Sequence, residues 1–177
     1  MARVTGAAGT KQSHPREVRA TVGLLLFLGV TAAAGGFVMA TGLGGEQVRP
    51  PREWLDGIPL VSSWVVPGLV LGLGFGAGSL ATAWGMASRL RWPWLGRVER
   101  RTGEHWSWLA AVALGVGQVV WIALELVYLP AVSWFQPLYG AVGLALVVLA
   151  LSRPARAALR VPAGTSPAPA GVAAQTS

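Results

Sequence analysis

Four long stretches of this 177-residue chain contain no aspartate, glutamate, lysine or arginine. They are residues 20–45, 57–88, 105–124 and 126–152. A transmembrane helix needs about 20 mainly apolar residues, and each stretch can supply them. A helix satisfies its own backbone hydrogen bonds in lipid, whereas an open strand does not. The sequence therefore predicts an all-α integral membrane protein with a four-helix transmembrane domain at 17–152, its helices at about 18–42, 62–88, 106–129 and 133–151.

The composition favours a lipid environment over water. Hydrophobic residues make up 53% of the chain and charged residues 12%, whereas soluble domains are about 25% charged. The absence of cysteine excludes disulfides, thiolate metal sites and thiol catalysis. The net charge of +7 is divided among segments between apolar stretches, so we expect anionic lipid head groups as the partner and no nucleic acid.

The basic residues indicate an orientation. All lysines and arginines except Arg49 and Arg52 precede the first span, lie between the second and third, or follow the fourth. Basic segments stay on the cytoplasmic side, so both termini and the middle loop are expected there, and the two other loops outside. Tryptophans near the span ends fit interfacial anchors, with Trp92, Trp94, Trp106 and Trp108 inside and Trp54, Trp64 and Trp134 outside.

The segments outside the spans have the composition of tails and loops. We expect residues 1–16 to be a disordered basic tail and residues 153–177 a disordered Ala/Pro-rich tail. The first outer loop contains Pro50, Pro51, Trp54 and Leu55. It is compatible with a short interfacial helix whose Trp54 and Leu55 enter the head groups, or with an irregular loop.

Glycines repeat along the second span. Gly68, Gly72 and Gly76 are four residues apart, and so are Gly74 and Gly78. Such stripes of small residues allow close helix contact in membranes. The contacting helix can belong to the same chain or to a second copy, so a homodimer through this helix is possible.

Apart from Arg19 at the start of the first span, Glu125 is the one acidic or basic residue inside a predicted span, and membrane carboxylates need a partner, water or a proton. Three polar or aromatic residues share its side of the helix, and two more begin the fourth span. The candidate binding residues are Glu125, Gln118, Trp121, Tyr128, Gln136 and Tyr139. They predict an outward-facing polar pocket for a proton, a cation or a lipid head group. Alternatively, Glu125 is a buried carboxylate that fixes helix packing through Gln136, Tyr139 or an arginine such as Arg49 or Arg52.

Catalytic patterns are absent. The chain has no HExxH motif and no GxxxxGK[ST] loop, and we predict no enzyme activity, no metal and no cofactor. The adjacent Glu104 and His105 are expected to be a solvated pair at the inner interface. The spacing of Glu53, Asp56 and Glu125 does not specify paired catalytic acids.

Several short stretches together resemble a known group. They are Gly35-Gly36, Trp54 to Pro59, Ser63-Trp64, Pro67 to Leu69, Gln118 with Trp121 and Glu125, and Gln136 to Gly140. The chain is similar, over about residues 18–151, to a family of small uncharacterised four-helix bacterial integral membrane proteins. It has Leu60 where such proteins often have an aromatic residue. The resemblance implies a multi-pass protein of the bacterial inner membrane, and it implies no reaction.

Two functional hypotheses follow. The first is a non-enzymatic accessory or structural membrane component with a polar pocket around Glu125. The alternative is a small homodimeric proton-coupled carrier of cationic or lipophilic solutes, with one membrane carboxylate in each copy. Small multidrug carriers are similar in size and have one essential carboxylate, but theirs lies in the first helix, so this comparison is an analogy.

Overall fold

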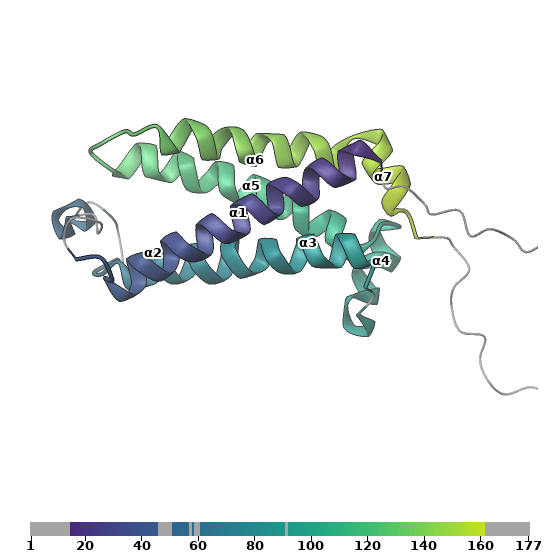
Figure 1. Cartoon of the computed structure of the whole chain (residues 1–177), viewed down its shortest axis with the longest axis horizontal. Helices are drawn as coiled ribbons and strands as arrows, with labels where there is room; N and C mark the ends of the chain where they lie inside the picture. The colour runs from purple at the N-terminus through teal and green to yellow at the C-terminus, as the bar shows by residue number, and fades with distance from the viewer. Residues whose placement is uncertain (1–14, 46–50, 57, 59–60, 91, 162–177) are drawn as a thin grey trace, which may run out of the picture.

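The computed structural model describes residues 15–45, 51–56, 58, 61–90 and 92–161, and within these the regular secondary structure is helical apart from one isolated β-bridge, Glu104 to Arg160 (Figure 1). The elements in order are α1 (Arg16–Thr41), η1 (Arg52–Leu55), α2 (Val65–Leu69), η2 (Val70–Ala77), α3 (Gly78–Ser88), η3 (Pro93–Leu95), α4 (Gly96–Thr102), α5 (Trp106–Tyr128), α6 (Phe135–Leu151) and α7 (Arg153–Leu159).

Three helices are long and apolar enough to cross a membrane, namely α1, the continuous segment Val65–Ser88, and α5. The pair α6 and α7 also qualifies if it is taken as one span, although it is bent by 62°. Large apolar side chains cover the outside of these helices, as Val30, Val127 and Val148 show with exposures of 61%, 74% and 67%. The prediction of an all-helical fold is confirmed for the described residues, which contain three to four helices of membrane length where the sequence predicted four.

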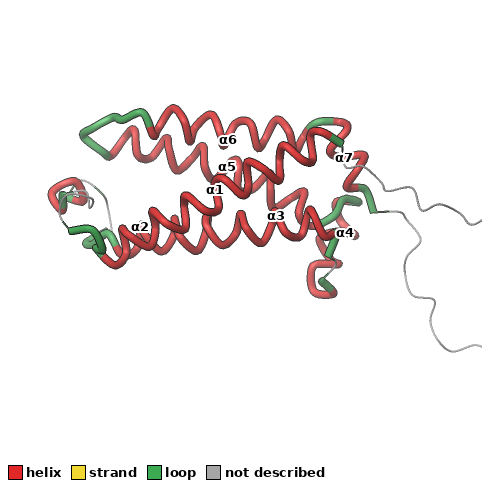
Figure 2. The backbone as a smooth tube through the Cα atoms, viewed as in Figure 1, coloured by secondary structure: helices red, strands yellow, loops and turns green. Residues whose placement is uncertain are grey.

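The long helices form two hairpins, which lie close together at one end (Figure 2). In the first hairpin, α1 packs along α2, η2 and α3; in the second, α5 packs along α6. We call the end with α4, α7 and both described chain ends the terminal end, and the other the loop end. α1 starts beside α7 and α6 and ends beside α2 (Figure 1). Because α1 moves away from the second hairpin along its length, the hairpins are farther apart at the loop end.

The glycines of the second predicted span pack against α1 in the same chain. A Cβ atom at Gly36 would clash with the backbone of Gly72, and one at Gly68 would lie 2.6 Å from the Ala40 nitrogen. A Cβ atom at Gly76 would lie 2.8 Å from the Ala33 backbone. The stripe that includes Gly68, Gly72 and Gly76 is therefore filled intramolecularly, while dimerisation through other faces of this helix stays a prediction.

The middle of this second segment is a π-helix, η2, which the sequence analysis did not predict. It joins α3 at Gly78, whose N–H is shared between the carbonyls of Leu73 and Phe75. π-Helical turns are rare and are found frequently at functional sites.

The predicted disorder of the tail at 153–177 is wrong for its first residues, because Arg153–Leu159 is the helix α7. The Ser152 hydroxyl accepts a hydrogen bond from the Ala155 N–H, and Pro154 lies in the first turn, where its missing N–H costs nothing. Ala155 and Leu159 are buried, each 1% exposed. The alanine-rich composition gave no indication of this short amphipathic helix. Residues 1–14 and 162–177 of the predicted tails lie outside the described residues.

The outer loop forms one 3-10 turn, η1, directly after Pro51. Leu55 is only 4% exposed and Trp64 only 5%, so both pack inside the protein. The predictions that Leu55 enters the head groups and that Trp64 is an interfacial anchor are therefore wrong. Residues 46–50, 57 and 59–60, with Arg49 among them, lie outside the described residues.

Candidate functional site

Glu125 lies near the loop end of α5 and is half-buried. The Trp121 indole N–H donates to its Oε1 atom at 2.6 Å, from one helical turn earlier. The Gln136 side chain, from the first turn of α6, also hydrogen-bonds the carboxylate. Both hydrogen bonds offset part of the cost of burying this carboxyl group.

Gln136 is positioned by the loop between α5 and α6. Its Oε1 atom accepts from the Ser133 backbone N–H and from the Ser133 hydroxyl, both at 2.8 Å. With this oxygen occupied, the amide NH₂ group is the donor left for the carboxylate. The chain of contacts from Ser133 through Gln136 and Glu125 to Trp121 ties the two helices of this hairpin together at their turn.

Two aromatic members of the predicted site contact the other hairpin. The Trp121 ring meets Phe75 of η2 edge-on at a centroid distance of 5.9 Å. Tyr139 stacks against Phe27 of α1 at 6.0 Å. These residues pack the two hairpins against each other.

Tyr128 does not join this network in the structure. It is the last residue of α5 and is 39% exposed, and the carboxylate partners are Trp121 and Gln136. Of the two arginines considered as partners, Arg52 is exposed on η1, and Arg49 lies outside the described residues.

The predicted outward pocket at Glu125 stays a prediction. An open hollow among the described residues belongs to the outer loop and is lined by Arg52, Leu55, Asp56, Ile58, Val61 and Ser62.

Gln118 lies two turns from Glu125 toward the terminal end and is 2% exposed. Among the residues that the structure describes, its Oε1 atom has no hydrogen-bond partner, and neither has the Oγ atom of Ser79. Leaving such a buried group unsatisfied costs about 1–3 kcal/mol. Gln118 is therefore the one predicted site residue whose polar group is unexplained by the packing.

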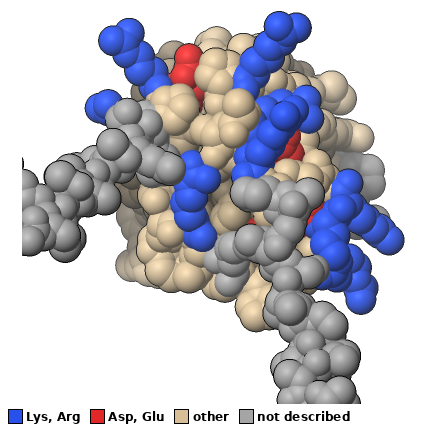
Figure 3. All heavy atoms as spheres, turned by 90° about the vertical axis from the view of Figure 1, so that its right-hand side faces the viewer, with Lys and Arg blue, Asp and Glu red and all other residues tan. Residues whose placement is uncertain are grey.

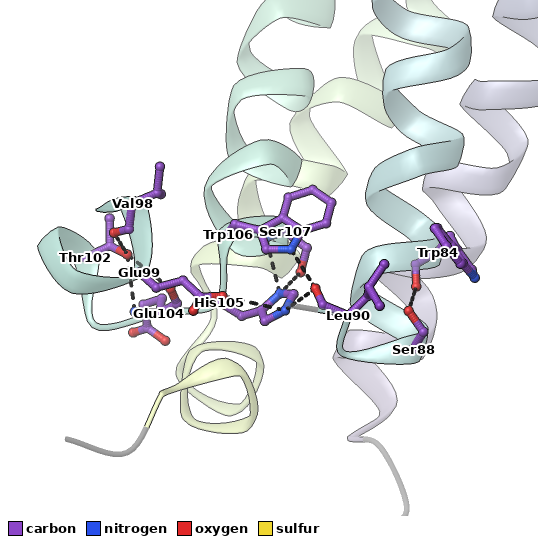
Figure 4. Close-up of polar contacts among 10 residues, drawn as sticks. All are labelled: Trp84, Ser88, Leu90, Val98, Glu99, Thr102, Glu104, His105, Trp106 and Ser107. Atoms are coloured by element: carbon purple, nitrogen blue, oxygen red, sulfur yellow. Dashed lines mark hydrogen bonds and ion pairs between the residues drawn. The ribbon is translucent and has the colours of Figure 1, made fainter. Parts of the chain in front are cut away.

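A second polar cluster, which the sequence analysis missed, lies at the terminal end (Figure 4). His105 is 5% exposed; its Nδ1 atom lies 2.8 Å from the Ser107 hydroxyl and its Nε2 atom 3.1 Å from the Leu90 carbonyl. The Glu99 carboxylate is 3.8 Å from the same Nε2 atom. Glu104 is 2% exposed, so the prediction of a solvated Glu104–His105 pair is wrong.

The burial of this pair results from α7. The His105 N–H donates to the Leu159 carbonyl at 2.8 Å, and the Val161 N–H donates to the Gly103 carbonyl at 3.0 Å. Glu104 Oε1 lies 3.4 Å from Arg156 Nε and 4.0 Å from Arg160 Nε. Arg156 and Arg160 are one helical turn apart, a spacing that could have indicated a shared acidic partner.

The surface of the terminal end is basic and aromatic. Figure 3 views this end, and arginine side chains surround it. The indole of Trp92 stacks on Trp94 at 5.5 Å and on Trp106 at 5.3 Å. Trp94 is 71% exposed, while Trp106 is 7% exposed and donates its indole N–H to the Leu90 carbonyl at 2.9 Å. Trp94 fits the predicted interfacial role, and Trp106 packs inside the protein.

Among the residues that the structure describes, no group of three or more His, Cys, Asp or Glu side chains could hold a metal ion. Comparison with protein-family models, with curated proteins and with solved structures finds no match for the chain. The resemblance to small bacterial four-helix membrane proteins therefore stays a prediction.

Proposed function

We propose that this chain is a non-enzymatic accessory or structural component of a bacterial inner membrane, crossing it four times with the terminal end in the cytoplasm. The exposed apolar side chains of the long helices support a lipid environment. The distribution of Lys and Arg supports the orientation, because arginines gather at the terminal end. The exposed Trp94 beside these arginines favours contact with anionic head groups.

The observation that carries this proposal is the bonding of Glu125. Its identified partners, Trp121 and Gln136, both belong to its own hairpin and hold it beside the turn. A carboxylate that binds a changing ligand needs access and freedom to exchange partners, whereas this one is held by two donors. Glu125 therefore acts as a structural lock of the α5–α6 hairpin.

The test is Glu125→Gln in the full chain, reconstituted in nanodiscs. The variant keeps the shape of the side chain but loses its charge, so the free energy of unfolding should fall by about 1–2 kcal/mol. Tyr128→Phe is the matched control, since Tyr128 is exposed on the same helix and its change should leave the stability unaltered.

A second readout separates this role from transport. Liposomes containing either variant or the unmodified chain are given an outward proton gradient and the lipophilic cation tetraphenylphosphonium. Equal uptake for the unmodified chain and Glu125→Gln supports the structural role. Gradient-dependent uptake that Glu125→Gln abolishes, with stability unchanged, would reject it.

A homodimeric proton-coupled carrier is the second candidate, and one observation favours it. The hydrogen bonds of Trp106 and His105 to Leu90 join the two hairpins at the terminal end. Toward the loop end, the contacts of Phe75 with Trp121 and of Phe27 with Tyr139 are apolar ring contacts. Such contacts can slide or part without breaking a hydrogen bond, so the hairpins could open around Glu125. The uptake experiment distinguishes the two candidates.

A further inference from the structure

One arginine at the terminal end is held in position by two contacts. The Nε atom of Arg156, on α7, donates to Glu104 Oε1 at 3.4 Å. The centre of its guanidinium group lies 5.4 Å from the centroid of the Trp108 ring. A guanidinium group has five N–H donors, and the bond to Glu104 uses the one on Nε. Within the described part of the chain, the donors on the two Nη atoms are left for another acceptor, and the side chain is 46% exposed.

Three arginines share one side of α7 and of the residue that follows it. At about 100° per residue, Arg153, Arg156 and Arg160 lie within about 60° of one another around the helix axis, and all three are exposed. In the described ranges, the ion pairs of these arginines are those with Glu104, at 3.4 Å from Arg156 and 4.0 Å from Arg160. One carboxylate therefore faces three positive charges, and this surface attracts a further anion.

Trp108 places the Arg156 guanidinium group at the edge of the apolar surface. The Trp108 indole N–H donates to the Ala150 carbonyl at 2.8 Å, so the ring lies across the seam between the start of α5 and the end of α6. The next residues on these two helices, Leu109 and Leu151, are 40% and 48% exposed. An arginine and exposed apolar side chains are thus adjacent, which matches the boundary between the head group and the acyl chains of a phospholipid.

The direction of α7 agrees with a position at a membrane surface. α7 is bent by 62° from α6. When α6 runs along the normal of a bilayer, α7 therefore lies nearer to the plane of the surface than to the normal. Its arginines are then distributed along the head-group region instead of across the membrane.

We infer that Arg156, with Arg160 beside it, binds the phosphate group of an anionic phospholipid at the rim of the terminal end. The planar guanidinium group can donate two parallel hydrogen bonds to phosphate oxygens. Glu104 orients this group through Nε, and the Trp108 ring supports it through a cation–π contact. The acyl chains of the lipid then lie against the exposed leucines of α5 and α6.

A phospholipid fits this surface better than a soluble phosphate does. A soluble anion gains only exposed ion pairs, which contribute little in water. A phospholipid is already concentrated in the bilayer and adds the contacts of its acyl chains, so the same arginines bind it more effectively. The inference rests on the proposed membrane location of the terminal end, and it goes beyond that proposal by assigning a ligand class to particular residues.

The test is native mass spectrometry of the full chain in detergent with phosphatidylglycerol and phosphatidylcholine, in equal amounts and with the same acyl chains. The unmodified chain should retain phosphatidylglycerol several-fold more than phosphatidylcholine. Equal retention of the two lipids would overturn the inference without any variant being needed. An excess of inorganic phosphate should leave the lipid bound, whereas displacement of the lipid would identify a site for free phosphate and would also reject the proposal.

Two substitutions of Arg156 locate the site. Arg156→Gln should reduce the retention of phosphatidylglycerol several-fold. Arg97→Gln is the matched control, since it removes the same charge from an exposed arginine of α4 at the same end. Arg156→Lys keeps a charge to pair with Glu104, and so the docking of α7, but it cannot donate two parallel hydrogen bonds. Its retention should fall less than that of Arg156→Gln. Equal retention in Arg156→Gln and Arg97→Gln, or unchanged retention in Arg156→Lys, would overturn the assignment.

Flotation with vesicles separates this inference from the proposed function. The unmodified chain and every variant should float with vesicles of either lipid, because the apolar helices insert whatever the head group is. A chain that floats without retaining phosphatidylglycerol preferentially would overturn the lipid site alone. A chain that does not float would overturn the membrane location, and the lipid site with it.

Discussion

The two ends of the bundle use buried polar groups differently. At the terminal end, the side chains of His105 and Trp106, at the start of the second hairpin, hydrogen-bond to the carbonyl of Leu90, which follows the first hairpin. Glu104 pairs with Arg156 and so connects α7 to the same end. At the loop end, Glu125 bonds within one hairpin to Trp121 and Gln136. The terminal end thus joins separate elements, whereas the loop-end network stabilises one turn. The partners of each buried acid therefore indicate its role: Glu104 connects separate elements, and Glu125 stabilises one hairpin.

The largest expected effect comes from separating the hairpins at the terminal end with Gly85→Val. A Cβ atom at Gly85 would overlap the Trp106 ring, so the larger side chain must displace Trp106 from Leu90. Overpacking of this kind costs about 1–3 kcal/mol, and the lost hydrogen bond adds about 1 kcal/mol.

Thermal unfolding in detergent measures this change. Gly74→Ala is the matched control, because Gly74 is exposed and the nearest atom to the added methyl group is a side-chain carbon of Val70, in the same helix, at 4.0 Å. Equal stability of the two variants would show that the Trp106 contact does not hold the hairpins together.

A smaller effect is expected from Glu104→Gln, which weakens the docking of α7. The substitution removes the charge that faces Arg156 and Arg160, and because both arginines are exposed to solvent the loss should be about 1 kcal/mol or less. Hydrogen–deuterium exchange should rise in residues 153–159 and stay unchanged in the α5–α6 turn.

Glu53→Gln provides the control for this experiment, since Glu53 is exposed on η1. If α7 exchanges no faster in Glu104→Gln, its attachment rests on the apolar contacts of Ala155 and Leu159 and on the backbone hydrogen bond from His105 to Leu159, and the charge of Glu104 adds nothing measurable.

The smallest expected effect is the energetic coupling between the two hydrogen-bond networks, measured as the non-additivity of two substitutions in the free energy of unfolding. Trp106→Phe removes the bond to Leu90, and Trp121→Phe removes the bond to Glu125. Fifteen residues of α5 separate them, about 22 Å, so their effects on unfolding should add to within about 0.5 kcal/mol. A double-mutant cycle that measures a coupling above 1 kcal/mol would mean that the two networks form one cooperative unit.

Much of the fold could be predicted from local pattern, and parts of the candidate site could be too. The charge-free stretches indicated the long helices to within a few residues, because apolar length is a property of the sequence alone. Glu125, Trp121 and Gln136 were also identified in advance, since the i to i+4 spacing and the short turn bring them together. Tyr128 was included because it shares the helix side, yet α5 ends there and leaves it exposed.

Other features depended on contacts between distant segments. The π-helix η2 contains Gly72 and Gly76, which lie against α1, and no local rule predicts it. The burial of Glu104 and His105 needs α7, which begins about fifty residues later in an alanine- and proline-rich segment.

The sequence by itself determined that this chain forms long apolar helices with basic residues gathered at one set of ends and a single acid in the third. These properties follow from composition and spacing, which act within one helix. The tertiary structure decided which partner each buried polar group has: Leu90 for His105, the arginines near α7 for Glu104, and Trp121 for Glu125. The physical reason is that hydrogen bonds are short and directional, so the pairing of distant residues is set by how the helices pack.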